Sequence, residues 1–176
     1  MIALKLALIS LAAASPVMVE VRQDTGGFQK EMLASHNFYR YQHGAKDLIW
    51  DDGLAKSAQG WADTCNIYHE GTWAQGIGEN LAWRWPFINW AAFVNSWGVE
   101  RLQYNWNTPG SQDAAGHFTQ LVWKQTTKVG CGWKLCNGYL YYLVCRYSPA
   151  GNDWGLGQFE ANVAPQIHGS PTDVYK

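Results

Sequence analysis

The spacing of apolar positions predicts two helices in the first part of the chain. Over residues 28–43, apolar and aromatic side chains recur every three or four positions, which is the period of one helix face, and Gly44 follows as a stop signal. A second run with this period covers residues 54–68. Asp51 and Asp52 precede it, and we expect one of them to cap the helix.

The middle of the chain shows both irregular and helical patterns. Residues 70–86 are rich in glycine and have no regular period, so we expect a loop. A third helix is predicted over 88–104, followed by a polar loop over 105–116 that contains proline and glycine. A short helix is predicted over 118–123.

From residue 129 onward the pattern is typical of strands. Asn137 and Gly138 lie between two strand-like runs, which favours a two-residue hairpin of type I′. A glycine-broken segment at 151–163 is expected to add one more strand, and the polar tail at 165–176 is expected to fray. Helices and strands that follow one another in blocks predict an α+β fold.

The four cysteines predict two disulfide bonds. An even cysteine count behind an export signal favours disulfides over a zinc site, which the absence of any C-x2-C pair also disfavours. A two-residue hairpin sets Cys131 opposite Val144, so a single bulge brings Cys145 beside Cys131. Cys136 lies at the turn, about 20 Å from Cys145 at about 3.3 Å per residue. We therefore predict the pairs Cys131–Cys145 and Cys65–Cys136.

The first 15 residues have the pattern of an export signal. Lys5 precedes an apolar run over 6–14, which is shorter than the roughly 20 residues that a membrane-spanning helix needs. Small residues at 12–15 offer a cleavage site, so we expect a secreted protein without a transmembrane segment; a buried N-terminal helix is the alternative. The formal net charge of −1 gives no basic footprint for nucleic acid. The 11 tryptophans suggest that some rings line an apolar site as well as the core.

Four segments resemble the signature motifs of one protein family. They are His36-Asn37-Phe38-Tyr39-Arg40, Gly78-Glu79-Asn80-Leu81, and the longer stretches 116–123 and 142–152. In order and spacing they resemble the CAP superfamily of cysteine-rich secretory, antigen 5 and pathogenesis-related class 1 proteins, and the fungal secreted members most of all. The resemblance covers residues 28–163. It implies one domain over 16–164, folded as a three-layer α-β-α sandwich with a small twisted antiparallel sheet between helices.

The resemblance also implies a polar constellation in a central cavity. The family's two histidines and two glutamates correspond here to His69, Glu79, Glu100 and His117. Imidazoles and carboxylates that converge in a cleft could hold a divalent cation such as zinc, magnesium or calcium, although no cofactor is expected to be obligatory. The alternative is that the four groups only hydrogen-bond one another and the backbone.

A catalytic function is disfavoured by the sequence. His69-Glu70 begins like a zinc-protease H-E-x-x-H helix, but Trp73 stands where the second histidine belongs. No G-x-S-x-G elbow occurs, and Glu70 replaces the serine that related sequences often carry after the histidine. A metal-assisted hydrolase therefore stays an alternative only. His36 and Arg40, one helical turn apart, are interpreted as a buried hydrogen-bonding node.

A cluster of aromatic residues provides the main hypothesis for a ligand. Trp83, Trp85, Phe87 and Trp90 fall within eight positions around a proline, so some should be exposed or line a groove. Because similar fungal proteins bind sterols and fatty acids, the resemblance implies a non-enzymatic lipid binder or exporter that acts outside the cell. Two alternatives remain: the rings pack the core, or the chain is a defence or virulence module with a protein partner and no small ligand.

Overall fold

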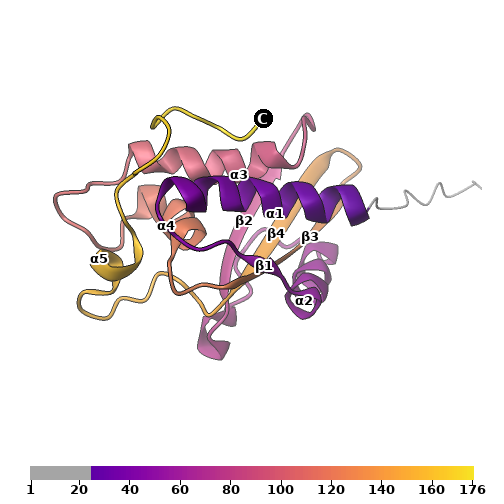
Figure 1. Cartoon of the computed structure of the whole chain (residues 1–176). Coiled ribbons are helices and arrows are strands. Elements are labelled where there is room, and N and C mark those ends of the chain that lie inside the picture. Colours follow the sequence, from indigo (N-terminus) through magenta and orange to yellow (C-terminus); the bar gives the residue numbers. More distant parts are fainter. Residues whose placement is uncertain (1–24) are drawn as a thin grey trace, which may run out of the picture.

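The computed structural model describes residues 25–176, and in it three layers enclose two apolar cores. A four-stranded sheet separates α2 on one face from α1, α3 and α4 on the other (Figure 1). This confirms the predicted α+β sandwich. The export signal predicted at 1–15 lies outside the described residues. Within the described part of the chain, no helix combines the length and the apolar character needed to cross a bilayer.

The elements follow one another in a fixed order. The helices are α1 (Thr25–Gln42), α2 (Asp52–Asp63), α3 (Ala91–Gly98), α4 (Gly116–Val122) and α5 (Gln158–Asn162). The strands are β1 (Ile49–Trp50), β2 (Gly78–Arg84), β3 (Lys128–Cys136) and β4 (Leu140–Ser148). Short 3-10 turns are η1 (Thr72–Gln75), η2 (Val99–Leu102) and η3 (Asp113–Ala115).

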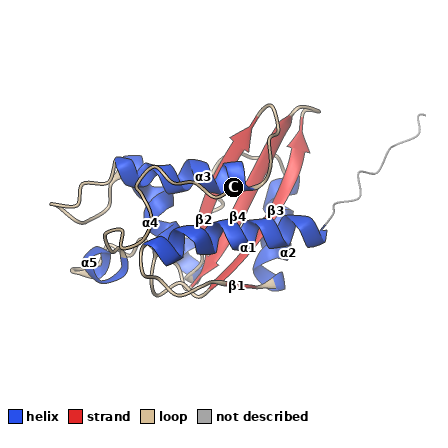
Figure 2. Cartoon of the chain, turned by 45° about the horizontal axis from the view of Figure 1, so that its top comes forward, coloured by secondary structure: helices blue, strands red, loops and turns tan. Residues whose placement is uncertain are grey.

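The sheet has the order β1-β3-β4-β2, and Figure 2 shows its three long strands side by side. β1 is parallel to β3, and the other pairs are antiparallel. β2 corrects the sequence analysis, which expected an irregular loop over 70–86 and placed Glu79 in it. Its register runs from Gly78 opposite Tyr147 to Arg84 opposite Tyr141. This strand depends on pairing with a distant segment, which its glycine-flanked local sequence does not reveal.

The β3–β4 hairpin differs from the predicted two-residue turn. Cys136 pairs with Leu140, so three residues form the loop. Asn137 and Gly138 both adopt the left-handed conformation, with φ of 52° and 78°. The predicted turn at Asn137-Gly138 is confirmed, but the loop has one residue more than a strict type I′ hairpin.

Both predicted disulfides are confirmed. The longer loop sets Cys131 directly opposite Cys145 without a bulge, and these two residues are bonded. The second bond joins Cys65, just past the end of α2, to Cys136 at the hairpin turn. It ties α2 to the end of the sheet, next to the loop that leads to His69.

Three predicted elements, two helices and one strand, need correction. Asp51 caps α2 through a hydrogen bond of 3.0 Å from Leu54 N, but the helix ends at residue 63, not 68. The third helix is shorter than 88–104 and continues as the 3-10 turn η2. The strand expected within 151–163 is wrong: α5 forms there, because Phe159 and Val163, one helical turn apart, both pack into the core.

Two glycines of β3 set the distance between the sheet and α2. A Cβ built on Gly130 would lie 2.2 Å from Ala55 N, and one on Gly132 would lie 2.4 Å from Gln59 Cα. No other residue fits at either position without moving the helix backbone. This close approach also places Ser57 of α2 against Arg146 of β4.

The C-terminal segment 165–176 packs on the helical layer, which differs from the frayed tail that we expected. Ile167 N donates to Gln42 O at the end of α1, and the buried Arg101 donates to the carbonyls of Ser170 and Pro171. These partners are far from the tail in sequence, so its composition alone gives no sign of the docking.

Candidate functional site

All four sequence motifs meet in one buried hydrogen-bond network. His36 Nδ1 lies 2.7 Å from Met32 O, and because a carbonyl only accepts, Nδ1 carries the proton. His36 Nε2 therefore accepts from the Tyr147 hydroxyl at 2.9 Å. Asn80 Nδ2 reaches both the Tyr147 hydroxyl and His117 O. Burial lowers the pKa of His36 to about 4, so the neutral imidazole is the form that the fold holds.

Arg40 completes this node, as the sequence analysis predicted. Its guanidinium is buried and donates to four carbonyl groups, at distances of 2.7 to 3.1 Å. The acceptors are Lys46, Leu121, Trp123 and Thr126. The side chain thus satisfies carbonyls at and beyond the C-terminal end of α4, which would otherwise be buried without partners.

Two of the four residues of the predicted constellation, His69 and Glu79, form a first pair on the side of the sheet that faces α2. The Glu79 carboxylate is only 4% exposed. Its Oε1 accepts from His69 Nδ1 at 2.9 Å and from Glu70 N at 3.2 Å, and its Oε2 lies 3.3 Å from Arg146 Nη2. Arg146 also contacts the Glu70 carboxylate, so one buried guanidinium serves two carboxylates.

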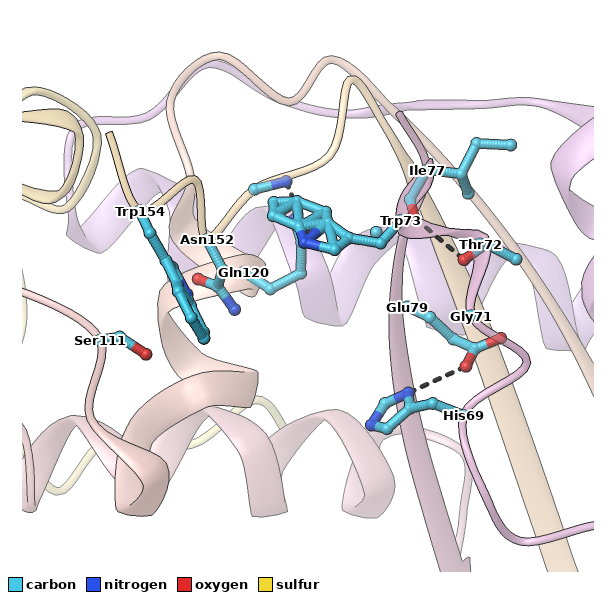
Figure 3. Close-up of a pocket in the computed structure, with 12 residues that line it drawn as sticks. His69, Gly71, Thr72, Trp73, Ile77, Glu79, Ser111, Gln120, Asn152 and Trp154 are labelled. Atoms are coloured by element: carbon cyan, nitrogen blue, oxygen red, sulfur yellow. Dashed lines mark hydrogen bonds and ion pairs between the residues drawn. The ribbon is translucent and has the colours of Figure 1, made fainter. Parts of the chain in front are cut away.

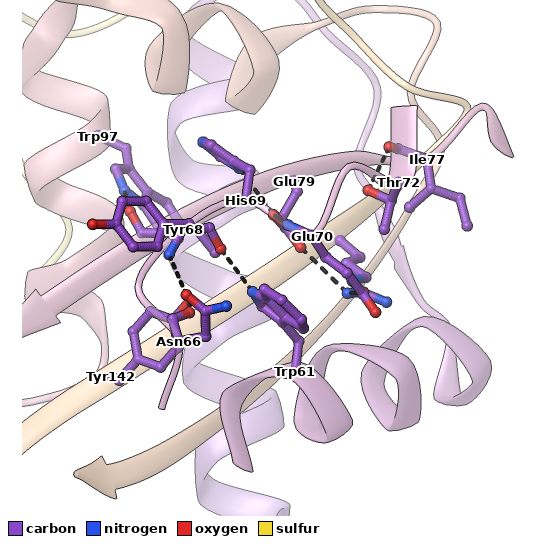
Figure 4. Close-up of polar contacts among 12 residues, drawn as sticks. Trp61, Asn66, Tyr68, His69, Glu70, Thr72, Ile77, Glu79, Trp97 and Tyr142 are labelled. Carbon is purple, nitrogen blue, oxygen red and sulfur yellow. Dashed lines mark hydrogen bonds and ion pairs between the residues drawn. The ribbon is translucent and has the colours of Figure 1, made fainter. Parts of the chain in front are cut away.

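The loop that carries His69 is fixed by contacts with α2 and the sheet (Figure 4). Trp61 Nε1 donates to Tyr68 O at 2.9 Å, and the Tyr142 hydroxyl donates to Asn66 O at 2.8 Å. The imidazole itself is 60% exposed. The backbone around His69 is therefore positioned while its ring stays accessible.

The second predicted pair, Glu100 and His117, stabilises the start of α4. Glu100 Oε1 accepts from His117 Nδ1 at 2.7 Å, and Oε2 accepts from the backbone N–H groups of His117 and Phe118 at 3.1 and 3.0 Å. The N-cap position is occupied by Ala115, which has no polar side chain, so Glu100 from η2 takes over the capping function. The His117 ring stacks on Trp97, with centroids 6.1 Å apart.

The structure arranges the four predicted residues as two separate His–Glu pairs. Among the histidine, cysteine, aspartate and glutamate side chains of the described residues, one group of three has all its ligand atoms within 4.8 Å of one another. It consists of His36, Cys131 and Cys145, and its two cysteines are disulfide-bonded. In both pairs Nδ1 faces a glutamate, and neither Nε2 has a hydrogen-bond partner in the part of the chain that is described. The donor set therefore fits a cation that prefers imidazole, such as zinc, better than magnesium or calcium, because the glutamate oxygens already accept N–H groups.

A cavity of about 460 Å³ opens beside the first pair (Figure 3). His69 and Glu79 line it, whereas His117 and Glu100 do not. Two tryptophans that the sequence analysis did not propose as site residues, Trp73 and Trp154, form part of its wall. The signal available in the sequence was their position: each is an isolated tryptophan within a glycine-rich loop.

The floor of this cavity is rigid and comes from the two longest motifs. Gln120 is buried, and its Oε1 accepts from Gly151 N at 2.9 Å. A Cβ on Gly78 would lie 2.0 Å from that same oxygen, so this glycine is required for the close packing. Asn152 accepts from Thr119 Oγ1 and donates to Gly116 O. Both amides are held in one orientation by the fold.

The predicted aromatic cluster divides into a surface part and a core part. Trp83 and Trp85 are 53% and 68% exposed, and Phe87 and Ile88 are also exposed. We call these four residues the β2–α3 aromatic surface. Trp90 instead packs against the core, with its ring 4.9 Å from Phe28 and 4.7 Å from both Phe87 and Trp133. It contacts Phe87 of this surface but does not itself belong to the surface.

Comparisons with known proteins agree with the fold and with the motifs. The family model described as "CAP: Cysteine-rich secretory protein family" matches residues 33–147. Protein PRY2 of Saccharomyces cerevisiae is 41% identical over 146 residues, covering 78% of this chain and 41% of PRY2. Secreted protein RBT4 of Candida albicans is 40% identical over 138 residues, covering 73% of this chain and 36% of RBT4. The chain thus spans less than half the length of these two fungal relatives.

Solved structures show the same architecture. The crystal structure of NaASP2 with Zn²⁺ aligns with a TM-score of 0.66 at 24% identity, covering 82% of this chain and 87% of that one. At this identity the match concerns the fold alone.

Proposed function

Because the chain belongs to the CAP family of cysteine-rich secretory proteins, we propose that it is a secreted, non-enzymatic protein that binds a sterol or a fatty acid outside the cell. Export is supported by the apolar run at 6–14 and by the likeness to a relative named as secreted. The β2–α3 aromatic surface is the observation that carries the proposed ligand.

This surface groups large apolar side chains that remain exposed to water. Trp83 and Trp85 expose more than half of their surface, and Ile88 is 61% exposed. A run of exposed apolar side chains of this kind marks a candidate site for a ligand, a partner or a membrane. Flat, rigid rings, of which Phe87 packs on Trp90, suit a flat, rigid ligand, because little side-chain freedom is lost on binding.

The test is sterol binding to the purified, secreted chain. Radiolabelled cholesterol and palmitate are titrated onto the wild type and onto the double variant Trp83→Ala/Trp85→Ala. Trp154→Ala is the matched control, since it removes a still more exposed tryptophan outside this surface. We expect saturable binding that weakens roughly tenfold or more in the double variant and is unchanged in the control. Undiminished binding by the double variant would remove this surface as the site, and no binding at all would favour the protein-interaction alternative.

A divalent cation is a second candidate ligand. The specific observation is that a glutamate holds Nδ1 of both His69 and His117 and leaves Nε2 free. Carboxylate-held imidazoles of this kind are typical of zinc ligands. When bound, such an ion would supply positive charge beside the imidazole that holds it. Glu79 and Glu100 would orient the rings and would not ligate the ion.

Calorimetric titration with zinc chloride tests this second candidate. We expect a heat of binding in the wild type that His117→Ala and His69→Ala each reduce, and that His168→Ala, an exposed histidine elsewhere, leaves unchanged. A wild type without heat, or single variants that bind like it, would refute cation binding at these histidines. Hydrolysis of a peptide or ester panel that requires zinc and His69 would support the hydrolase alternative instead.

A further inference from the structure

The cavity beside His69 continues into a second hollow. A neighbouring cavity of about 370 Å³ is formed by the loops around Pro109 and Gly157, and both cavities share Ser111 and Trp154 in their walls. The Trp154 indole therefore stands between two adjoining spaces. A site with two adjoining compartments suits a ligand made of successive units better than a single compact molecule.

The rings in this double cavity are available for a ligand. Trp73 is 49% exposed and Trp154 is 80% exposed. Among the described residues, neither ring stacks on another aromatic ring, and neither indole N–H has a hydrogen-bond partner. Trp61 and Trp97, by contrast, each donate to a backbone carbonyl. Figure 3 shows the Asn152 amide between the two indoles.

The polar groups of the site favour a neutral ligand. Among the residues that the structure describes, no lysine or arginine lines either cavity, so a phosphate, a sulfated chain or a fatty-acid carboxylate finds no counter-charge there. The Glu79 carboxylate already accepts hydrogen bonds from His69, from the backbone N–H of Glu70 and from Arg146. The polar atoms left for a ligand are the Ser111 hydroxyl, the His69 Nε2, the indole N–H groups and, in the second cavity, the exposed Glu160 carboxylate. The first three are neutral donors and acceptors, and the carboxylate accepts hydrogen bonds, so all of them match the hydroxyl groups of a neutral ligand.

From these observations we infer that the double cavity is a binding site for a neutral oligosaccharide. The apolar faces of successive sugar rings stack on Trp73 and Trp154, while their hydroxyl groups hydrogen-bond to the polar edge formed by Ser111 and His69. Hydrogen bonds of Gln120 and Asn152 hold the loop that carries Trp154, and Ala150 N donates to Gly76 O beside the 3-10 turn that carries Trp73. This site is distinct from the β2–α3 aromatic surface, so it stands whether or not the chain binds lipids.

The experiment is a titration of the full chain with N-acetylchitohexaose, laminarihexaose and cellohexaose, followed by calorimetry and tryptophan fluorescence. We expect saturable binding of at least one of these neutral hexasaccharides and none of a heparin hexasaccharide. Trp154→Ala and Trp73→Ala should each weaken the affinity roughly tenfold or more. Trp85→Ala, which removes an exposed tryptophan outside the double cavity, should bind like the wild type.

Three results would overturn the inference: no binding of any neutral hexasaccharide, equal binding by Trp154→Ala, or preference for the heparin fragment. Circular dichroism of each variant shows whether it is folded; exposed rings leave the core intact when removed. The sterol titration above uses Trp154→Ala as its control, and this one uses Trp85→Ala. Each site can therefore fail without affecting the conclusion about the other.

Discussion

The variant Glu100→Ala tests whether the Glu100 carboxylate stabilises the fold or serves as a ligand of a cation. Its side chain is 18% exposed and accepts three hydrogen bonds, one from the His117 ring and two from backbone N–H groups in the first turn of α4. Glu100→Ala removes all three. The two N–H groups then depend on water, because Ala115 at the N-cap position cannot replace the carboxylate.

The magnitude follows from these contacts. A hydrogen bond to a charged group contributes about 1.5–3 kcal/mol, and an N-cap contributes about 1 kcal/mol. The three bonds share one carboxylate and are partly hydrated, so they are not additive. We expect Glu100→Ala to lower the free energy of unfolding by about 2–4 kcal/mol, a large part of the roughly 5–15 kcal/mol available to a domain. Glu100→Gln keeps one acceptor oxygen and should lose about half as much.

The assay is urea unfolding followed by tryptophan fluorescence, with the disulfides intact and EDTA present. Glu160→Ala, which removes an exposed glutamate of α5, is the control and should stay within about 0.5 kcal/mol of the wild type. A loss below about 0.5 kcal/mol in Glu100→Ala would refute the capping argument. A loss that appears only when zinc is added would instead make Glu100 a ligand of the ion.

Three further predictions concern the rest of the fold. Burial lowers the pKa of His36 and of His43 to about 4, so the unfolded chain binds more protons than the folded chain between pH 4 and about 6.5. The stabilisation should therefore be complete above that range and should fall towards pH 4. The fall is up to about 1.4 kcal/mol per pH unit for each histidine. Urea midpoints measured from pH 7.5 to 4.5 check this, and a flat profile would contradict it. Gly130→Ala should lower the free energy of unfolding by about 1–3 kcal/mol, because its Cβ meets the backbone of α2. Gly60→Ala, with open space around it, should be neutral or stabilising. Equal urea midpoints for the two variants would show that α2 can shift. Arg101→Ala should release the C-terminal segment, seen as faster trimming by carboxypeptidase, and an unchanged rate would mean that the segment is held by its other contacts.

Local sequence determined the elements whose stabilising partners lie close by in the chain. The period of apolar residues located α1 and α2, and Asp51 was identified as a cap because its partner, Leu54 N, lies three residues away. The turn at Asn137-Gly138 needed only the φ preferences of these two residues. The cysteine pairing followed because the hairpin limits which cysteines can meet.

The tertiary structure decided every feature whose partners are distant in sequence. β2 exists because β4 accepts its hydrogen bonds, and its own residues carry no strong strand pattern. The family resemblance implied the two histidines and two glutamates, but only the folded chain showed that they form separate pairs, and that Glu100 caps a helix it does not belong to. The same holds for Trp73 and Trp154, which two separate loops bring to one cavity. Local propensities act over a few residues, whereas packing joins any surfaces that fit, so composition and period cannot reveal such pairs.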